Sequence, residues 1–126
     1  MNRKEINTDK APAAVGPYSQ AVTAGNFVYT SGSIPFTPDG NPVPGGVVEQ
    51  TEQIFRNLKE VLAAAGADFG HVIKANCYLK DMNDFQAFNE VYARQFPDFK
   101  PARTTVEVSR LPKDVLVEVE LIAFKD

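Results

Sequence analysis

The sequence predicts an α+β fold in which two helices pack on one face of a single mixed β-sheet. Three patterns support this prediction. Apolar residues recur at helical spacing within residues 47–65, an aromatic helical stripe follows within 83–96, and five shorter runs have the character of strands. In chain order the elements are β-β-α-β-α-β-β, an order in which both helices can cover the same side of one sheet.

Length and composition indicate an ordinary soluble protein, and we expect residues 1–126 to form a single domain. Hydrophobic residues make up 44% of the chain and charged residues 23%. The net charge of −3 argues against a general phosphate-binding surface. Cys77 is the only cysteine, which excludes an intramolecular disulfide and a cysteine-rich metal site. No signal peptide or membrane segment is apparent, so we expect a cytoplasmic protein.

The first predicted elements are two short strands at Tyr18–Val22 and Phe27–Ser31. Residues 23–26 lie between them and are typical of a hairpin turn. The following segment, residues 34–46, contains so many prolines and glycines that we expect a loop.

The strongest local pattern predicts a helix over about residues 47–65, with Gly66 as its C-terminal cap. Its apolar positions are Ile54, Phe55, Leu58, Val61, Leu62 and Ala65. A buried strand is expected at about 72–80. The residues expected on one face of that strand are Ile73, Ala75, Cys77 and Leu79.

A second helix is predicted to begin near Asn83, which would act as N-cap with Gln86 completing a capping box. The helix must end before Pro97. Its aromatic stripe consists of Phe85, Phe88, Tyr92 and Phe96. We expect the phenylalanines of this stripe to belong to the core.

Two further strands are expected at about 103–109 and 116–124, joined through residues 110–114. On the last strand, the residues expected to face the helices are Val117, Val119, Leu121 and Ala123. Those expected to face away are Glu118, Glu120, Ile122 and Phe124. A face that combines carboxylates with Ile122 and Phe124 is too apolar for full exposure, which favours a subunit interface.

The spacing of these strands also bears on two charged residues. If the strands form a plain hairpin, Glu118 lies opposite about residue 108, and roughly 16 Å separates it from Arg103. Either the register is bulged, or another subunit brings the two side chains together.

Several catalytic chemistries have no basis in this chain. His71 is the only histidine and lies in a polar turn, so a catalytic triad or a histidine-based metal site is not expected. Cys77 is expected to be a buried small hydrophobe. No phosphate-binding loop or dinucleotide fingerprint occurs. Chemistry must therefore use arginine, carboxylate, hydroxyl and backbone groups.

Arg103 is the strongest candidate, because it lies just after Pro101 at the start of a strand. Alternation directs Arg103, Thr105 and Glu107 to one side of that strand, and Thr104 to the other. A half-buried guanidinium requires an anion. That anion is either a structural carboxylate or a bound ligand. The carboxylates open as structural partners are those of Glu107, Glu118 and Glu120.

Four segments together resemble the RidA family, also called the YjgF family. The first two segments are residues 11–20 (APAAVGPYSQ) and 29–35 (YTSGSIP). The third is residues 80–85 (KDMNDF), continuing to Asn89 and Tyr92, and the fourth is 101–108 (PARTTVEV), running on to Glu120. The match extends from about residue 9 to 124.

The resemblance implies a chorismate-mutase-like fold that forms a homotrimer, with sheets inside, helices outside and ligand clefts between subunits. It also implies hydrolysis of reactive enamine or imine intermediates, such as 2-iminobutanoate and 2-iminopropanoate, to 2-oxo acids and ammonia. Pyridoxal-phosphate-dependent dehydratases release those intermediates. No metal or organic cofactor is needed, and the expected ligand is a small 2-imino or 2-oxo acid.

The resemblance also assigns roles to individual residues. It places the arginine that marks the active subfamily at Arg103, which can hold a carboxylate through two parallel hydrogen bonds. Glu118 falls on a cleft position and can orient or deprotonate a water. The expected substrate-binding residues are Tyr18, Ser31, Gly32, Asn89, Arg103, Thr104 and Thr105. Thr105 stands where several members have cysteine, which excludes thiol chemistry there.

Two other functions remain open at this stage. One is a non-enzymatic trimeric protein that binds small carboxylates, such as 2-oxo acids, in the same cleft. The other is an endoribonuclease or translation inhibitor, an activity that has been attached to some family members. The acidic chain offers no basic stripe for RNA, which argues against the latter.

Overall fold

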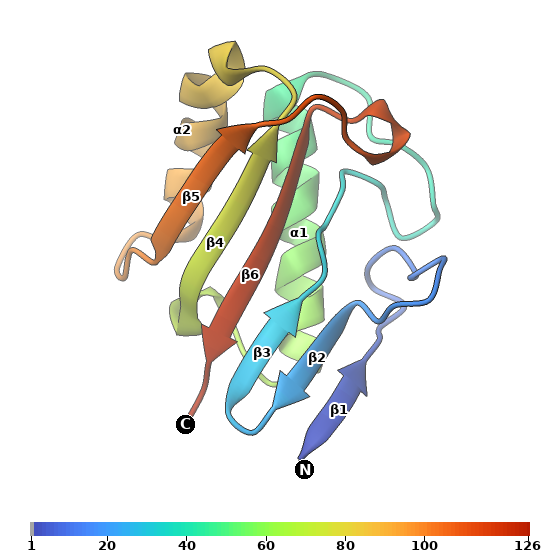
Figure 1. Cartoon of the computed structure of the whole chain (residues 1–126), viewed down its shortest axis with the longest axis vertical. Coiled ribbons are helices and arrows are strands. Elements are labelled where there is room, and N and C mark those ends of the chain that lie inside the picture. Colours follow the sequence, from blue (N-terminus) through green and yellow to red (C-terminus); the bar gives the residue numbers. More distant parts are fainter. Residues whose placement is uncertain (1) are drawn as a thin grey trace.

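The computed structural model describes residues 2–126 and confirms the predicted α+β fold. Six strands form one mixed sheet in the order β1-β2-β3-β6-β4-β5. Two helices cover one face of that sheet, and the other face is open (Figure 1).

The strands are β1 (Arg3–Ile6), β2 (Ala21–Ala24), β3 (Phe27–Thr30), β4 (Val72–Leu79), β5 (Ala102–Glu107) and β6 (Val117–Phe124). The helices are α1 (Val47–Ala64) and α2 (Phe85–Gln95). Short 3-10 turns occur at Phe69–His71, Met82–Asp84 and Pro112–Asp114.

The N-terminal part of the sheet differs from the prediction in two ways. No strand was expected at β1, a charged four-residue strand that pairs antiparallel with β2. The hairpin of β2 and β3 is confirmed, but β2 begins at Ala21 rather than Tyr18. The preceding residue, Gln20, uses its side chain to bind the loop before it. Gly25 has a φ of 58°, which permits the tight turn between the strands.

Helix α1 matches the predicted bounds closely. Its N-terminus is capped by Glu49, whose carboxylate accepts a hydrogen bond from the backbone N–H of Gly46 at 2.8 Å. Gly66, with a φ of +78°, ends the helix in the left-handed conformation that glycine adopts at low cost. The same cap was expected from the sequence.

Two local predictions around β4 and α2 were wrong. Ile73 does not share a face with Ala75, because β4 has a bulge between Val72 and Lys74 that leaves Ile73 40% exposed. Asn83 is not the N-cap of α2. Asp81 instead accepts a hydrogen bond from the backbone N–H of Asn83 at 2.9 Å, which starts a 3-10 turn ahead of the helix.

The last two strands do not form the plain hairpin on which the separation of roughly 16 Å was conditional. β4 lies between β5 and β6, pairing parallel with β5 and antiparallel with β6. The reason is that α2 carries the chain back across the sheet, so that β4, α2 and β5 form a crossover unit with parallel strands. The 16 Å separation inferred from a hairpin therefore does not apply.

The core lies between the sheet and the helices. As expected, the inward residues of β6 are buried, namely Val117, Val119, Leu121 and Ala123. The aromatic residues of the core form one cluster of contacting rings, namely Phe55, Phe69, Phe88, Tyr92 and Phe96. Within residues 2–126, no helix has the length and apolar character that a bilayer crossing requires.

The open face of the sheet carries large apolar side chains at solvent, as predicted for β6. Phe27 and Phe124 make an edge-to-face contact with ring centres 5.0 Å apart, yet 38% and 39% of their respective surfaces remain exposed. Tyr29, next to them, is 49% exposed. A contiguous apolar surface of this kind is typical of an interaction surface.

Candidate functional site

Arg103 lies against helix α2, on the covered side of the sheet. Its Nη1 donates a hydrogen bond to Oδ1 of Asn89 at 2.5 Å. Its guanidinium carbon is 4.6 Å from the ring centre of Tyr92 and 5.4 Å from that of Phe85, within the range of cation–π attraction. One stripe of α2 supplies all three contacts, because residues three and four apart share a helix face.

The positive charge of Arg103 has no carboxylate partner within 4.0 Å among the residues that the structure describes. This finding removes the structural ion pairs that the sequence left open. Glu107 accepts a hydrogen bond from a backbone N–H in the turn before α2, and Glu120 accepts one from the Tyr78 hydroxyl at 2.6 Å. Arg103 is half-buried, and its positive charge is not compensated by a carboxylate of the described residues.

Thr105 lies two residues after Arg103 on β5, on the same side of the sheet, and it pairs with Cys77 of β4. The Cys77 thiol is fully buried, and burial raises its pKa to about 12 against smaller opposing effects of Arg103 and Thr105. The Thr105 hydroxyl is near the thiol but forms no hydrogen bond of normal geometry with a described residue. A neutral, buried thiol does not act as a nucleophile.

Glu118 lies on the open face of β6, beside Gly32. A Cβ atom added to Gly32 would be only 2.9 Å from Cδ of Glu118, so the close approach requires glycine. Burial raises the pKa of Glu118, and the negative charge of Glu120 raises that pKa further. A half-buried carboxylate with a raised pKa is a better base than an exposed one, which suits it to accept a proton from water.

Tyr18 and Ser31 border a cavity of about 470 Å³ at the end of the sheet. The Ser31 hydroxyl donates a hydrogen bond to the backbone oxygen of Ser19 at 2.6 Å, which ties β3 to the loop that carries Tyr18. Tyr18 itself is 53% exposed. Gly32 also borders the cavity, whereas Arg103 does not.

Within one chain, the expected site residues therefore fall into two separate groups. The first group contains Tyr18, Ser31, Gly32 and Glu118. The second contains Asn89, Arg103 and Thr105. Arg103 shares the covered face with its partner Ala75, and Glu118 shares the open face with its partner Tyr78. The two charged groups cannot meet within a single chain.

Thr104 belongs to neither group. It points away from Arg103, and its hydroxyl accepts a hydrogen bond from Nζ of Lys74 at 3.1 Å on the open face.

Sequence reasoning missed two features of the site. Phe85 was assigned to the core and Tyr92 was given no role at the site, yet both contact the guanidinium. Gln20 was not singled out, although its buried side chain holds the loop before Tyr18. The available signal for the first feature was the spacing of Phe85, Asn89 and Tyr92 on one helix face.

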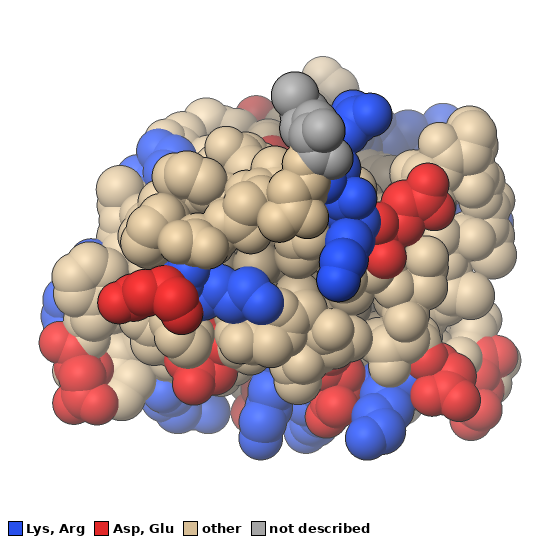
Figure 2. All heavy atoms as spheres, turned by 90° about the horizontal axis from the view of Figure 1, so that it is seen from below, with Lys and Arg blue, Asp and Glu red and all other residues tan. Residues whose placement is uncertain are grey.

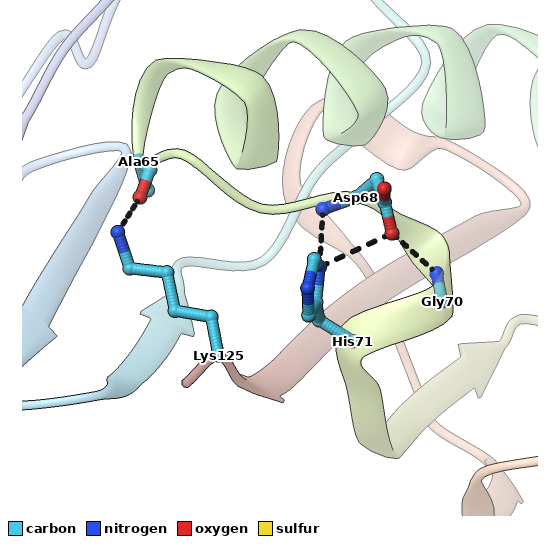
Figure 3. A network of polar contacts seen from close by, with 5 residues as sticks. All are labelled: Ala65, Asp68, Gly70, His71 and Lys125. Carbon is cyan, nitrogen blue, oxygen red and sulfur yellow. Dashed lines mark hydrogen bonds and ion pairs between the residues drawn. The ribbon is translucent and has the colours of Figure 1, made fainter.

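His71 has a structural role, as expected. Its Nδ1 accepts a hydrogen bond from the backbone N–H of Asp68 at 3.0 Å, and the Asp68 carboxylate accepts one from Gly70 (Figure 3). The same ring nitrogen lies 3.1 Å from the Asp68 carboxylate (Figure 3). Nearby, Nζ of Lys125, after β6, donates a hydrogen bond to the carbonyl of Ala65 at the end of α1 (Figure 3).

Charges of both signs are mixed on the surface near the termini, where Lys and Arg alternate with Asp and Glu (Figure 2). Among residues 2–126, no three His, Cys, Asp or Glu side chains cluster closely enough to hold a metal ion.

Comparison with known proteins places the chain in a family. Residues 8–125 match the family described as Endoribonuclease L-PSP, which is the RidA family that the sequence resembles. The chain belongs to this family. A RutC family protein of Pyrococcus abyssi is 51% identical over 127 residues, covering 100% of both chains.

The names of some other RidA family members state a reaction or a bound ligand. The mouse protein called 2-iminobutanoate/2-iminopropanoate deaminase is 50% identical over 122 residues, covering 96% of this chain and 90% of its own. The crystal structure of Escherichia coli TdcF with bound serine has a TM-score of 0.93 and 42% identity, covering 98% of this chain and 99% of that one.

Proposed function

We propose that this RidA family protein hydrolyses 2-imino acids, such as 2-iminobutanoate and 2-iminopropanoate, to 2-oxo acids and ammonia. The observation that carries the proposal is the uncompensated guanidinium of Arg103. A 2-imino acid supplies the missing anion, because its carboxylate can accept two parallel hydrogen bonds from one guanidinium. The name of the mouse relative supports the same chemistry.

The reaction needs little beyond positioning and a base. Water adds to the imine carbon, and the electron pair of the C=N bond moves to nitrogen. Glu118 accepts one proton from the attacking water and gives it to the nitrogen, which leaves a carbinolamine. Glu118 then accepts the remaining hydroxyl proton and gives it to the nitrogen as the C–N bond breaks, so that ammonia leaves and the C=O bond forms. A base placed in this way contributes on the order of 10²–10⁴-fold. The raised pKa of Glu118 suits it to both proton transfers.

We further propose that the working site forms between subunits of a homotrimer, with the open sheet faces inside. Arg103 and Glu118 lie on opposite faces of the sheet in one chain, so a second chain must bring them together. In this arrangement Arg103, Asn89 and Thr105 come from one subunit. Tyr18, Ser31, Gly32 and Glu118 come from its neighbour.

The activity is tested by coupling the purified protein to a threonine dehydratase and measuring 2-oxobutanoate release while free imine is trapped. Wild type should accelerate release, and Arg103→Ala should abolish the acceleration. Arg110→Ala is the matched control, because Arg110 is an exposed arginine paired with Asp114. No acceleration by wild type, or full activity of Arg103→Ala, would refute the proposal.

The shared site is tested by mixing two inactive variants. Arg103→Ala and Glu118→Ala chains are unfolded together, refolded and assayed. If each site takes one residue from each of two neighbours in a cyclic trimer, random mixing restores about one quarter of the sites. Recovery of no activity from well-folded mixed trimers would place both residues of a site in the same chain and contradict the proposal.

A second candidate function is binding of a small carboxylate without turnover. The serine-bound structure of TdcF favours it. This function predicts saturable binding of a 2-oxo acid in calorimetry, loss of that binding in Arg103→Ala, and no acceleration in the coupled assay.

The family description raises a third candidate, an endoribonuclease. The net charge of −3 and the mixed charges seen in Figure 2 give RNA little to bind. Salt-sensitive RNA binding by a nuclease-free preparation would favour this function over the one proposed.

A further inference from the structure

The guanidinium of Arg103 rests on a ring that is itself fixed in the core. Tyr92 is only 8% exposed, and its ring packs against those of Phe55, Phe88 and Phe96, with ring centres 4.9–5.9 Å apart. A side chain held on several sides in this way has little rotational freedom. The surface on which Arg103 lies is therefore rigid.

The hydroxyl of Tyr92 does not explain why the residue is there. It is buried and has no hydrogen-bond partner among the described residues. An unpaired buried hydroxyl is unfavourable, so the contribution of this residue comes from its ring. Burial also raises the pKa of Tyr92 to about 12, which keeps the ring neutral. What Tyr92 offers to Arg103 is the face of its ring.

The remaining contacts of Arg103 orient it without neutralising it. The Asn89 oxygen is a neutral acceptor and uses one of the five N–H donors of the guanidinium. The Phe85 ring adds a second neutral surface. Four donors remain, which is enough for a two-point contact with a carboxylate.

We infer that Tyr92 is a positioning residue, whose ring holds the guanidinium of Arg103 in the orientation that binds the substrate carboxylate. Phe85 and Asn89 complete this arginine cradle. The inference rests on the proposed function for its catalytic consequence. The cradle itself is a property of one chain and has its own test.

The first experiment measures 2-oxobutanoate binding by calorimetry and KM and kcat in the coupled assay. Tyr92→Phe keeps the ring and should bind within about twofold of wild type. Tyr92→Leu removes the ring and should weaken binding and raise KM about three- to tenfold, with a smaller change in kcat.

Phe69→Leu is the matched control. Phe69 belongs to the same aromatic cluster through Phe55 and Phe96 but does not contact Arg103 or Tyr92. It should lose stability without losing affinity. Equal binding by Tyr92→Leu and wild type would overturn the inference, as would equal weakening in Tyr92→Phe or Phe69→Leu.

The second experiment needs no ligand, and it separates failure of the cradle from failure of the proposed function. Urea unfolding of Tyr92→Leu, Arg103→Gln and the double variant forms a double-mutant cycle. Each variant changes the unfolding equilibrium constant by some factor. The factor for the double variant should be smaller than the product of the two single-variant factors, by about threefold or more. The proposed function fails if wild type neither turns over imine nor binds 2-oxobutanoate. The arginine cradle is overturned, independently, if the coupling free energy between Tyr92 and Arg103 is indistinguishable from zero.

Discussion

Replacing Gln20 with leucine should destabilise the loop that carries Tyr18. The Gln20 side chain is only 8% exposed and bonds to that loop at both of its polar atoms. Its oxygen accepts from the backbone N–H of Thr8 at 2.6 Å, and its nitrogen donates to the carbonyls of Thr8 at 3.0 Å and Pro12 at 2.7 Å. Leucine has a similar size and provides none of these bonds.

The expected magnitude follows from the three shortest bonds. Each contributes about 0.5–1.5 kcal/mol net, and a buried group left unpaired costs about 1–3 kcal/mol. Because the loop can relax toward water, we expect a loss of roughly 2–4 kcal/mol in the free energy of unfolding. Amide hydrogen exchange should also become faster across residues 8–18.

Urea unfolding at one fixed protein concentration measures this loss, since association contributes to apparent stability. Gln95→Leu is the matched control. Gln95 is a partly buried glutamine on α2 that makes a single bond, to the Val91 carbonyl at 3.0 Å, so its loss should stay below about 1 kcal/mol. The reasoning is refuted if the free energy of unfolding of Gln20→Leu lies within about 0.5 kcal/mol of the wild-type value. It is also refuted if Gln20→Leu loses no more stability than Gln95→Leu.

Three further predictions concern the site and its surroundings. Gly32→Ala should displace Glu118 and lower kcat about tenfold or more, with a circular dichroism spectrum like that of wild type; unchanged turnover would contradict the close approach. Because the folded chain binds the Glu118 proton more tightly than the unfolded chain, the free energy of unfolding should fall as pH rises through the raised pKa of Glu118. Glu118→Gln should reduce that fall when urea unfolding is measured from about pH 4 to 8. If the free energy of unfolding of Glu118→Gln depends on pH as steeply as that of wild type, the raised pKa of Glu118 is contradicted. Cys77, with a pKa of about 12, should resist a thiol reagent at about pH 8 in the folded protein and react once urea unfolds it; rapid labelling of the native state would show that the thiol is accessible.

The local elements could be predicted because their signals are short in range. Helix α1 follows from a strong 3.6-residue pattern that ends at Gly66, and the inward face of β6 follows from simple alternation. Ile73 was placed wrongly because a bulge shifts alternation by one residue and leaves no mark in composition. Strand order was harder still. Whether β5 pairs with β6 or with β4 depends on how α2 packs, which no local pattern encodes.

The candidate site was predictable in content but not in arrangement. The sequence pointed to Arg103 through its place after Pro101 and to Glu118 through resemblance. That the two lie on opposite faces of the sheet depends on the parallel register of β5 with β4, in which Arg103 pairs with Ala75. The roles of Gln20 and Tyr92 arise from contacts between distant segments, and such contacts are visible only in three dimensions.

The ends of the sheet restrict how copies of this chain can aggregate. One edge is β1, a strand of four residues that carries Arg3, Lys4 and Glu5. Short, charged edge strands disfavour the strand-to-strand stacking from which fibrils grow. The opposite edge, β5, begins just after Pro101, which has no N–H to offer an incoming strand. Fibrillar growth is thus discouraged at both margins, even though the chain exposes aromatic side chains on the flat surface between them.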